Sequence, residues 1–481
     1  MTAQLRQLLR SKFVQDTLTL QVGKLSLVLL SFISSVVVWR LTGPARFGEF
    51  ALAQSFLVIW QSLDLTGIGT STSVRLAIAI GAKDTGAILD LMAFYVKVSL
   101  LINVGLLVVI ALLGTPVAGL LYGSAQIVGL AVGLAVGAIA DGLYGLVTTA
   151  LQSRRSMRAL ALMQNANQLV LTASMIAAVV ISPTAESLVI ARLVYSYSTL
   201  LLALAVYRRQ RTSGQVSYPP LSAIFARART VSPRPYWRFG VANAVDKNLG
   251  SLFTQIPLQL VGIFIGSRAV GYLNIATSGI VQASIFTTAV LDNMQAVVPQ
   301  AVGRGDYAGL WRNFTRVLAI MTLGGVALYG ALALLAPLLI PPILGTRWIP
   351  AIPALAALAI YGATTTVGGI FGPLYRAFDL MRRAIVVKII ALVVVLPLGV
   401  VALQQLAAGR DAVSHFFGAR VILSTDLVGA GAGALGGAWM INALFLISVS
   451  LTILVTLPEL RRRAQAARHG SDDLPANSAT K

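Results

Sequence analysis

The sequence contains no cysteine and only two histidines among its 481 residues. Disulfides, thiolate metal sites and cysteine nucleophiles are therefore excluded, and so is a metal cluster built from several histidines. Charge is also scarce, because only 11% of the residues are charged while 57% are hydrophobic. This composition lies outside the range of soluble globular domains and predicts a membrane protein.

Residue sets for catalysis are missing as well. No glycine-rich phosphate loop precedes a helix, and His415 and His469 lie in a loop and a tail where no Ser-His-Asp set can be assembled. The longest gap expected outside the membrane, residues 407–426, is too short to hold a domain. We interpret Arg410, His415 and Arg420 within it as a solvated loop. The sequence predicts no enzyme, no metal and no cofactor, with an ion gradient or the membrane potential as the candidate energy source.

Apolar runs of 18 or more residues recur along nearly the whole chain. Each can cross about 30 Å of hydrocarbon at roughly 1.5 Å per residue. The N-terminal residues 1–16 are polar and lack a cleavable-signal pattern, so the first span is expected to stay in the mature protein. The fold class is therefore an all-α polytopic membrane protein with twelve spans, at residues 18–40, 48–80, 88–113, 126–150, 159–182, 187–207, 238–265, 271–302, 313–340, 351–376, 384–406 and 427–457.

The net charge of +21 would indicate a nucleic-acid partner in a soluble protein. Here the basic residues gather in alternate gaps between the apolar runs, which is typical of a topology signal, and we expect no nucleic acid. The positive-inside rule places both termini and the central loop in the cytoplasm. The gaps that carry this signal hold Arg6, Arg10, Lys83, Arg154, Arg158, Arg208, Arg209, Arg227, Arg229, Arg304, Arg382, Arg383 and Arg461.

A stretch of sequence occurs twice. Residues Arg40 to Ser55 read RLTGPARFGEFALAQS, and residues Ile263 to Ser278, 223 positions later, read IFIGSRAVGYLNIATS. Further on, AIGAKD at Ala79 to Asp84 recurs as AVGRGD at Ala301 to Asp306, now offset by 222. Internal repeats of this kind build many transporters, with the substrate path between the halves.

The duplication predicts an N-terminal six-helix lobe at 1–207, a basic cytoplasmic linker at 208–236, a C-terminal six-helix lobe at 237–457 and a basic, disordered cytoplasmic tail at 458–481. Because six is even, both lobes enter the membrane from the same side, as parallel repeats. The linker is expected to be an exposed, flexible connector. Its charge is read first as a topology determinant, with attachment to anionic lipid as the alternative.

Spans two and eight are too long to cross a bilayer as straight helices. About 33 residues of helix measure roughly 50 Å, so each span is expected to bend or to run into the cytoplasm. The second span has a weak point of its own in LDLTGIGTSTSVR, residues Leu63 to Arg75. Glycine, threonine and serine at membrane depth are tolerated where they pack on protein or face water.

Two lysines within the spans repeat the offset of the duplication, since Lys24 and Lys247 are 223 residues apart. Charges in hydrocarbon are costly, so each indicates a cavity or a partner. One interpretation is a pair of cations for an anionic head group such as a phosphate, extended by Arg75 and Lys97. The alternative is that Lys24 reaches the lipid head groups and that Lys247 pairs with Asp246.

Acidic residues within the spans are the candidates for proton or ion coupling. Asp141 and Asp292 fall near mid-span, and Asp246 and Asp64 lie in spans seven and two. An unpaired carboxylate at such depth could carry a proton. We favour the alternative, in which Asp141 and Asp292 pair with basic neighbours and hold helices together. Asp90 and Lys97 share a helix face but are too far apart to touch.

Three short stretches resemble a known family. They are R-L-x-G-P-x-x-F-G-x-F-x-L-A-x-S at Arg40 to Ser55, G-x-x-x-V-G-Y-L-N-I-A at Gly266 to Ala276, and G-A-G-A-L-G-G-A at Gly431 to Ala438. These are similar to the Wzx-type polysaccharide biosynthesis flippases of the multidrug/oligosaccharidyl-lipid/polysaccharide exporter superfamily. The resemblance implies two rocking lobes around a basic cavity. It carries over no catalytic residue, because the family has none.

The resemblance also implies a substrate and partners. The expected substrate is a polyprenyl-pyrophosphate-linked oligosaccharide, the repeat unit of an O-antigen, capsule or exopolysaccharide. It would move from the cytoplasmic to the periplasmic leaflet of the bacterial inner membrane. The expected partners are this lipid-linked glycan, membrane lipid and the polysaccharide polymerase and chain-length proteins, with the chain itself a monomer.

Three other functions stay open at the level of sequence. A MATE-like drug or cation antiporter would need a carboxylate in its cavity, and the first span has none, Asp16 lying outside it. A membrane-embedded polysaccharide polymerase or ligase is disfavoured by the lack of a large external loop. A scaffold without transport activity has no need of the polar stripes. These stripes consist of Gln21, Lys24, Ser31 and Ser35 in span one and of Asn243, Asp246, Lys247, Gly250 and Thr254 in span seven.

Overall fold

The computed structural model describes residues 12–62, 68–122, 126–154, 156–212, 217–232, 234–378, 380–416 and 425–469. Within these ranges every regular element is a helix. The chain divides into two compact units, residues 1–57 with 66–240 and residues 58–65 with 241–481. We call them the N-terminal lobe and the C-terminal lobe.

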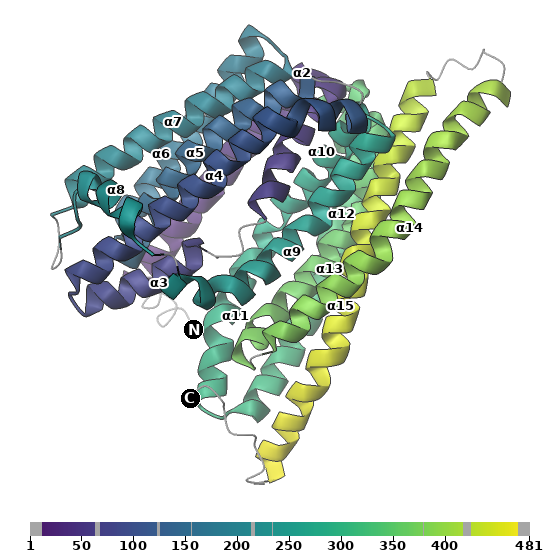
Figure 1. Cartoon of the computed structure of the whole chain (residues 1–481). Helices are drawn as coiled ribbons and strands as arrows, with labels where there is room; N and C mark the ends of the chain where they lie inside the picture. Colours follow the sequence, from purple (N-terminus) through teal and green to yellow (C-terminus); the bar gives the residue numbers. More distant parts are fainter. Residues whose placement is uncertain are drawn as a thin grey trace. The chain divides into compact units, whose positions relative to one another are not determined.

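The N-terminal lobe is a bundle of long helices. Its α4, α5, α6 and α7 lie side by side (Figure 1), with α5 packed against both α4 and α7. The core between them is apolar and includes Ile88, Met92 and Phe94 from α4 and Val147 from α5, all buried. The helices are α2 (Lys12–Gln61), α3 (Ile68–Gly81), α4 (Thr85–Tyr122), α5 (Gln126–Ser153), α6 (Met157–Ile181), α7 (Ala185–Gln210) and α8 (Leu221–Thr230).

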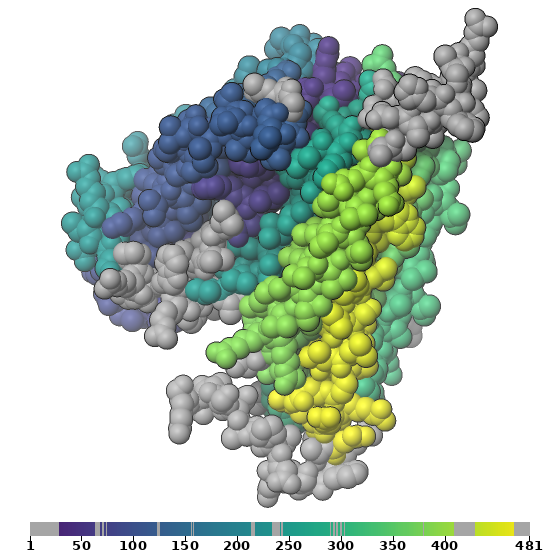
Figure 2. All heavy atoms as spheres, turned by 45° about the vertical axis from the view of Figure 1, so that its right-hand side comes forward, coloured from purple at the N-terminus to yellow at the C-terminus, as the bar shows by residue number. Residues whose placement is uncertain are grey.

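The C-terminal lobe is organised around α13, which packs against α12 and α15. The space-filling view shows α14 and α15 in contact along much of their lengths (Figure 2). Phe314 of α12 and Phe371 of α13 meet edge to face in the core, with ring centroids 5.2 Å apart. The elements are α9 (Arg234–Phe264), α10 (Ser267–Ala283), α11 (Ile285–Gly303), α12 (Tyr307–Leu344), the short 3₁₀ helix η1 (Thr346–Ala351), α13 (Ile352–Ala377), α14 (Met381–Phe416) and α15 (Thr425–His469).

Ten helices in the described ranges are long and apolar enough to cross a membrane, so the chain is a multi-pass membrane protein. Two features account for the difference from the twelve predicted spans. One of the ten, Val28–Gln61, lies in α2, a pair of helices joined by a kink at Gly43, and predicted spans one and two meet there. Predicted span seven corresponds to α9, which is not among the ten.

The kink is one of two matching glycine conformations. Gly43 has φ 73° and ψ 171°, and its repeat partner Gly266, at the start of α10, has φ 115° and ψ 174°. This region of backbone space is open essentially to glycine alone, because any side chain would clash with the backbone. The glycines at the centre of the duplicated sequence therefore perform the same backbone task in both lobes.

The second duplicated motif forms the same turn twice. Lys83 and Gly305 both have a left-handed backbone, with φ of 57° and 70°. The next residue caps a helix in each lobe, because Asp84 Oδ1 accepts a hydrogen bond from Ala87 N at 2.9 Å and Asp306 Oδ1 accepts one from Gly309 N at 2.8 Å. Such caps satisfy backbone donors that have no partner within the helix. Both turns lead into helices of 38 residues.

Spans two and eight, which were expected to bend or to run into the cytoplasm, are each divided into two helices. α2 ends at Gln61 and α3 begins at Ile68, while α10 and α11 are divided at Ser284. Four spans were predicted too short, because α4 and α12 extend beyond their predicted limits, α14 continues to Phe416 rather than ending at 406, and α15 continues to His469 rather than ending at 457. Half of the loop expected at 407–426, residues 407–416, is therefore helical, and His415 lies within α14.

Candidate functional site

One ion pair of the C-terminal lobe joins α9 to α14. Lys388 Nζ lies 2.7 Å from Asp246 Oδ1 and donates a second hydrogen bond of 2.7 Å to the Asp246 carbonyl oxygen. The two side chains are 22% and 23% exposed, so the pair is largely withdrawn from solvent. Lys388 thereby neutralises the carboxylate and joins two helices.

The interpretation that Lys247 pairs with Asp246 is wrong. Consecutive residues on a helix point about 100° apart and do not face each other, so a partner from another helix takes the carboxylate. Lys247 is exposed, and no ion pair is found for it among the described residues. Ser251 Oγ donates to the carbonyl oxygens of Lys247 and Asn248, each at 3.2 Å. Lys247 therefore follows directly, in the sequence, a carboxylate whose charge is already neutralised by Lys388, and its own side chain is exposed.

The N-terminal lobe carries a different ion pair. Arg192 Nη2 on α7 lies 2.8 Å from Asp141 Oδ2 on α5, and the two side chains are 28% and 30% exposed. The Arg192 guanidinium also lies over the ring of Tyr195, 4.7 Å from its centroid. This contact agrees with the alternative favoured from the sequence, in which Asp141 pairs with a basic neighbour and holds two helices together.

Three candidate residues fall outside what the structure describes. Asp64 belongs to residues 63–67, between α2 and α3, and the side chains of Lys24 in α2 and Asp292 in α11 lie outside the described part. Arg75 is described and lies half-buried on α3, where it makes polar contacts. Among the described residues there is no group of three or more His, Asp or Glu side chains that could hold a metal ion.

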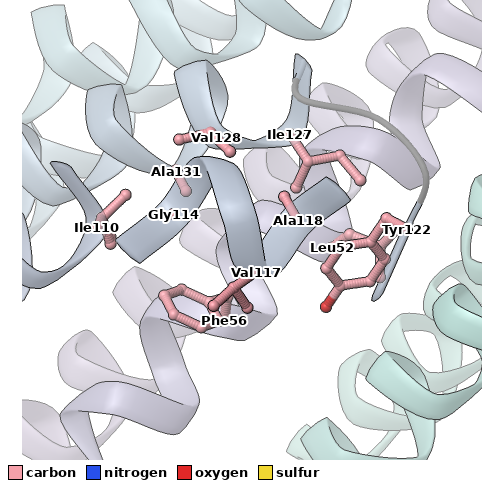
Figure 3. A pocket seen from close by; sticks show the side chains of 10 residues that line it. All are labelled: Leu52, Phe56, Ile110, Gly114, Val117, Ala118, Tyr122, Ile127, Val128 and Ala131. Atoms are coloured by element: carbon pink, nitrogen blue, oxygen red, sulfur yellow. The ribbon is translucent and has the colours of Figure 1, made fainter. Parts of the chain in front are cut away.

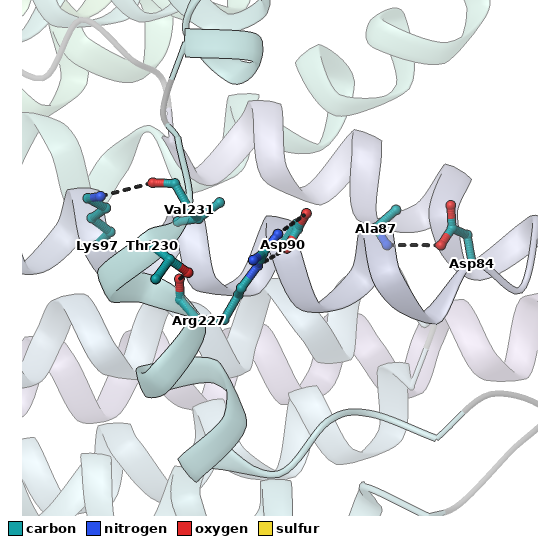
Figure 4. Close-up of polar contacts among 7 residues, drawn as sticks. All are labelled: Asp84, Ala87, Asp90, Lys97, Arg227, Thr230 and Val231. Carbon is teal, nitrogen blue, oxygen red and sulfur yellow. Dashed lines mark hydrogen bonds and ion pairs between the residues drawn. The ribbon is translucent and has the colours of Figure 1, made fainter.

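The linker differs from the expected flexible connector, because residues 217–232 pack against the N-terminal lobe. Ile224 on α8 is fully buried and joins the core of that lobe. Arg227 of α8 donates two hydrogen bonds to the carboxylate of Asp90 on α4 (Figure 4). Its Nε lies 2.6 Å from Oδ1 and its Nη2 lies 3.2 Å from Oδ2. The apolar face of this short amphipathic helix and its arginine fork explain the packing.

Lys97 is part of the same attachment. Its Nζ donates to the carbonyl oxygen of Val231 at 2.9 Å (Figure 4). It also approaches the carbonyl oxygen of Arg229, at 3.5 Å. These carbonyls follow the end of α8 or lie in its last turn, where helical acceptors lack partners and a cation is favourable. Lys97 therefore holds the linker, and Asp90 and Lys97 act on it separately without touching each other.

Two tyrosines fix the beginning of the docked segment. The Tyr218 hydroxyl donates to Ala150 O at 2.7 Å, the Tyr207 hydroxyl donates to Pro219 O at 2.8 Å, and their rings stack with centroids 6.0 Å apart. Burial raises the pKa of Tyr218 to about 12, although the neighbouring Arg154 guanidinium acts to lower it. The segment is therefore held from residue 218 onward by hydrogen bonds and by apolar packing.

A small pocket lies between α2, α4 and α5 (Figure 3). Leu52 and Phe56 of α2 face Gly114 and Val117 of α4 across about 40 Å³, and no charged side chain lines it. Sites for small molecules measure roughly 300–1,000 Å³. The pocket is too small and too apolar to hold a sugar.

Comparison of the sequence with protein families gives a match to the polysaccharide biosynthesis protein family over residues 37–353. The match spans well over half of the chain. The chain belongs to this family. No curated protein matches the sequence. The resemblance to polysaccharide biosynthesis proteins that the duplicated motifs indicate is thus confirmed.

Solved structures show which fold this family member has. An inward-facing multidrug resistance MATE family transporter of the MOP superfamily matches with a TM-score of 0.68 and 15% identity, over 93% of this chain and 96% of that one. An outward-facing MATE transporter matches with a TM-score of 0.58 and 16% identity, over 97% and 99% of the two chains. The eukaryotic MATE transporter AtDTX14 gives a TM-score of 0.59 and 14% identity, over 92% and 95%. The chain therefore has the MATE fold.

Sequence reasoning missed two cations in this polysaccharide biosynthesis protein. Arg192 lies within a predicted span, as Asp141 does, and the co-occurrence of an acid and a base at membrane depth was the available signal. Lys388 lies near the predicted start of span eleven, where a basic residue is also expected as a topology signal. In both lobes a base of one helix neutralises an acid of another, which leaves Lys247 as an exposed cation near the C-terminal pair.

Proposed function

We propose that this protein is a MOP-type transporter that flips a polyprenyl-pyrophosphate-linked oligosaccharide from the cytoplasmic to the periplasmic leaflet of the bacterial inner membrane. The observation that carries the proposal is membership of the polysaccharide biosynthesis protein family together with a transporter fold. The cargo is a repeat unit of an O-antigen, capsule or exopolysaccharide.

The physical task explains why a transporter fold serves polysaccharide synthesis. A pyrophosphate and a chain of sugars cannot cross hydrocarbon, because removing charge and hydroxyls from water costs far more than the lipid tail recovers. The protein has to replace that hydration while the tail remains in the bilayer. Alternating access does so by opening a polar path first to one side of the membrane and then to the other.

We assign head-group binding to Lys24, Lys247 and Arg75. The exposed Lys247 supports this assignment, because its neighbour Asp246 is already neutralised by Lys388 and does not compete for it. A lysine ammonium acts on a phosphate as a compact point charge. Lys97, whose amine is engaged by the linker, is left out of the set.

For the energy source we propose an ion gradient or the membrane potential, without any cofactor. The carboxylates of Asp141 and Asp246 sit in ion pairs, so protonation of either would have to release Arg192 or Lys388. Asp292 and Asp64 are the other two coupling candidates. The proposed partners are the glycan lipid, membrane lipid and the polymerase and chain-length proteins, with a monomer as the working unit.

The test uses purified protein in liposomes that contain a fluorescent polyprenyl-pyrophosphate oligosaccharide. Flipping is followed by the fraction of label that a membrane-impermeant quencher reaches. Wild type should flip, and Lys247→Gln should lower the rate about tenfold, the effect of losing one charged hydrogen bond to the head group. Lys83→Gln is the matched control, an exposed lysine outside the spanning helices, and should flip like wild type.

The second candidate function is a drug or cation antiporter, favoured by the structural likeness to multidrug MATE transporters. A bound cation would need a carboxylate that can be freed, and Asp141 paired with Arg192 is the described group on which to test this. Uptake of a cationic dye into the same liposomes, abolished in Asp141→Asn, together with no flipping of the glycan lipid, would put the antiporter first.

A further inference from the structure

An open groove lies between the exposed side of α4 and helix α8. It encloses about 800 Å³, and residues of both helices line it, among them Lys97, Leu101, Val104, Val108, Phe225 and Arg229. The apolar side chains among these are exposed, Leu101 at 72%. Such a strip of leucine, valine and phenylalanine beside a membrane-spanning helix is suited to a hydrocarbon chain and not to water.

The end of the groove nearest α8 is cationic. Arg229 is exposed there, no ion pair is found for it among the described residues, and Lys97 Nζ lies 3.5 Å from its carbonyl oxygen. None of the described residues that line the groove is acidic. The carboxylate of Asp90, on the same helix α4, is paired with Arg227. An arginine fork matches the geometry of a phosphate.

The dimensions fit a lipid of one leaflet. The α4 residues that line the groove run from Val96 to Val109, a helix length of roughly 20 Å. One leaflet contributes about 15 Å of hydrocarbon. The cations at one end and the apolar floor along the rest therefore match the two parts of a phospholipid, whereas the polyprenyl chain of a sugar carrier is much longer than this floor.

We propose that the groove between α4 and α8 is a binding site for an anionic membrane phospholipid. Arg229 binds the headgroup phosphate, and one acyl chain lies on Leu101, Val104 and Val108. The lipid extends the packing of α8 on α4, so it ties the linker to the N-terminal lobe. By the positive-inside prediction it is a lipid of the cytoplasmic leaflet. The site is independent of what the protein transports.

The experiment is native mass spectrometry of the full-length protein released from detergent after incubation with phosphatidylglycerol or phosphatidylcholine. Wild type should retain one phosphatidylglycerol in preference to phosphatidylcholine. Arg229→Gln should lower that preference about fivefold, as expected for one cation near a lipid surface. Arg209→Gln removes an exposed arginine of α7 that does not line the groove, and it should leave the preference unchanged.

A second pair of variants tests whether the acyl chain of the lipid lies in the groove. An added Cβ at Gly105, within the groove, meets nothing within 4 Å, so Gly105→Leu fills the groove without disturbing α4. Gly119→Leu places the same side chain in equally open space on the same helix, away from the groove. Retention of phosphatidylglycerol should fall in Gly105→Leu and persist in Gly119→Leu. Equal losses in all four variants, or none, would overturn the site. Stronger retention of polyprenyl phosphate than of phosphatidylglycerol would also overturn the assignment.

Discussion

The two lobes share their backbone signals but not their charges. Gly43 and Gly266 adopt the same glycine-only conformation, and Asp84 and Asp306 cap helices of equal length with the same hydrogen bond. The ion pairs, in contrast, do not correspond. Counting the six predicted spans within each lobe, Asp141 and Arg192 join the fourth to the sixth, whereas Asp246 and Lys388 join the first to the fifth.

The difference separates what the fold requires from what the function uses. A kink and a capped turn depend on steric and hydrogen-bonding rules that act equally on both copies after duplication. The position of a buried charge depends on which neighbour supplies a counter-ion, and this can change in one copy alone. We infer that the lobes are alike in architecture and unlike in how they treat charged groups.

The largest expected effect comes from breaking an ion pair. In Lys388→Met the Asp246 carboxylate stays largely buried without its cation, and the free energy of unfolding should fall by about 2–3 kcal/mol. Chemical denaturation in detergent micelles followed by circular dichroism measures this. The double variant Asp246→Asn with Lys388→Met should recover part of the loss. Simple addition of the two single effects would show that the pair is not coupled.

The kink glycines come next. Gly43→Ala and Gly266→Ala each force a side chain into a conformation that costs about 2 kcal/mol, and the same denaturation experiment should show similar losses for both. Gly119→Ala is the control, since Gly119 lies within α4 and an added Cβ meets nothing within 4 Å. It should be neutral or stabilising. A loss confined to one kink would break the equivalence of the two lobes.

A smaller effect is expected in the linker between the two six-span repeats. Tyr218→Phe removes the hydrogen bond to Ala150 O, worth about 1 kcal/mol, and limited proteolysis should then cut the linker faster. The pKa of Tyr218 is raised to about 12 in the folded chain, above about 10 for an exposed tyrosine. The stabilisation is complete below pH 10 and is lost as the pH rises toward 12.

The same proteolysis therefore provides a pH test of this contact. Wild type should be cut faster as the pH increases between 10 and about 12, while Tyr218→Phe should respond less. Identical pH profiles for the two proteins would show that another group controls the release of the linker.

The smallest effect concerns the repeated turn, where one lobe has lysine and the other glycine. Lys83→Gly should stabilise by up to about 1 kcal/mol, and Gly305→Ala should destabilise by a similar amount, because both positions are left-handed. Thermal unfolding of the two variants decides the signs. If both variants shifted the unfolding temperature in the same direction, the left-handed backbone at these two positions would not explain their effects.

Much of the fold could be predicted because duplication and hydrophobicity leave long signals. The repeated motifs around Gly43 and Asp84 predicted two equivalent lobes, although not the kink and the helix cap that these residues form. The length of spans two and eight indicated that neither is a single straight helix, and both are divided into two helices. Helix ends were less predictable. Apolar length does not reveal that a helix continues beyond the bilayer, as α14 does to Phe416.

The charged contacts could not be predicted from spacing alone. Asp246 and Lys247 are adjacent in sequence but point apart, and the partner Lys388 lies 142 residues away. The docking of α8 was missed because a ten-residue helix is marginal by itself and gains its stability from tertiary packing. The burial of Ile224 and the pairing of Arg227 with Asp90 both depend on residues of the N-terminal lobe that are distant in the sequence.

The central claim is that a polysaccharide biosynthesis protein with the MATE fold moves a lipid-linked glycan by means of an exposed lysine. The most direct test is quencher-detected flipping of a polyprenyl-pyrophosphate oligosaccharide in liposomes that contain wild type, Lys247→Gln or Lys83→Gln. We expect flipping by wild type and Lys83→Gln and about tenfold slower flipping by Lys247→Gln. Absence of flipping by correctly inserted wild type would contradict the function, and unchanged flipping by Lys247→Gln would contradict the role of the lysine.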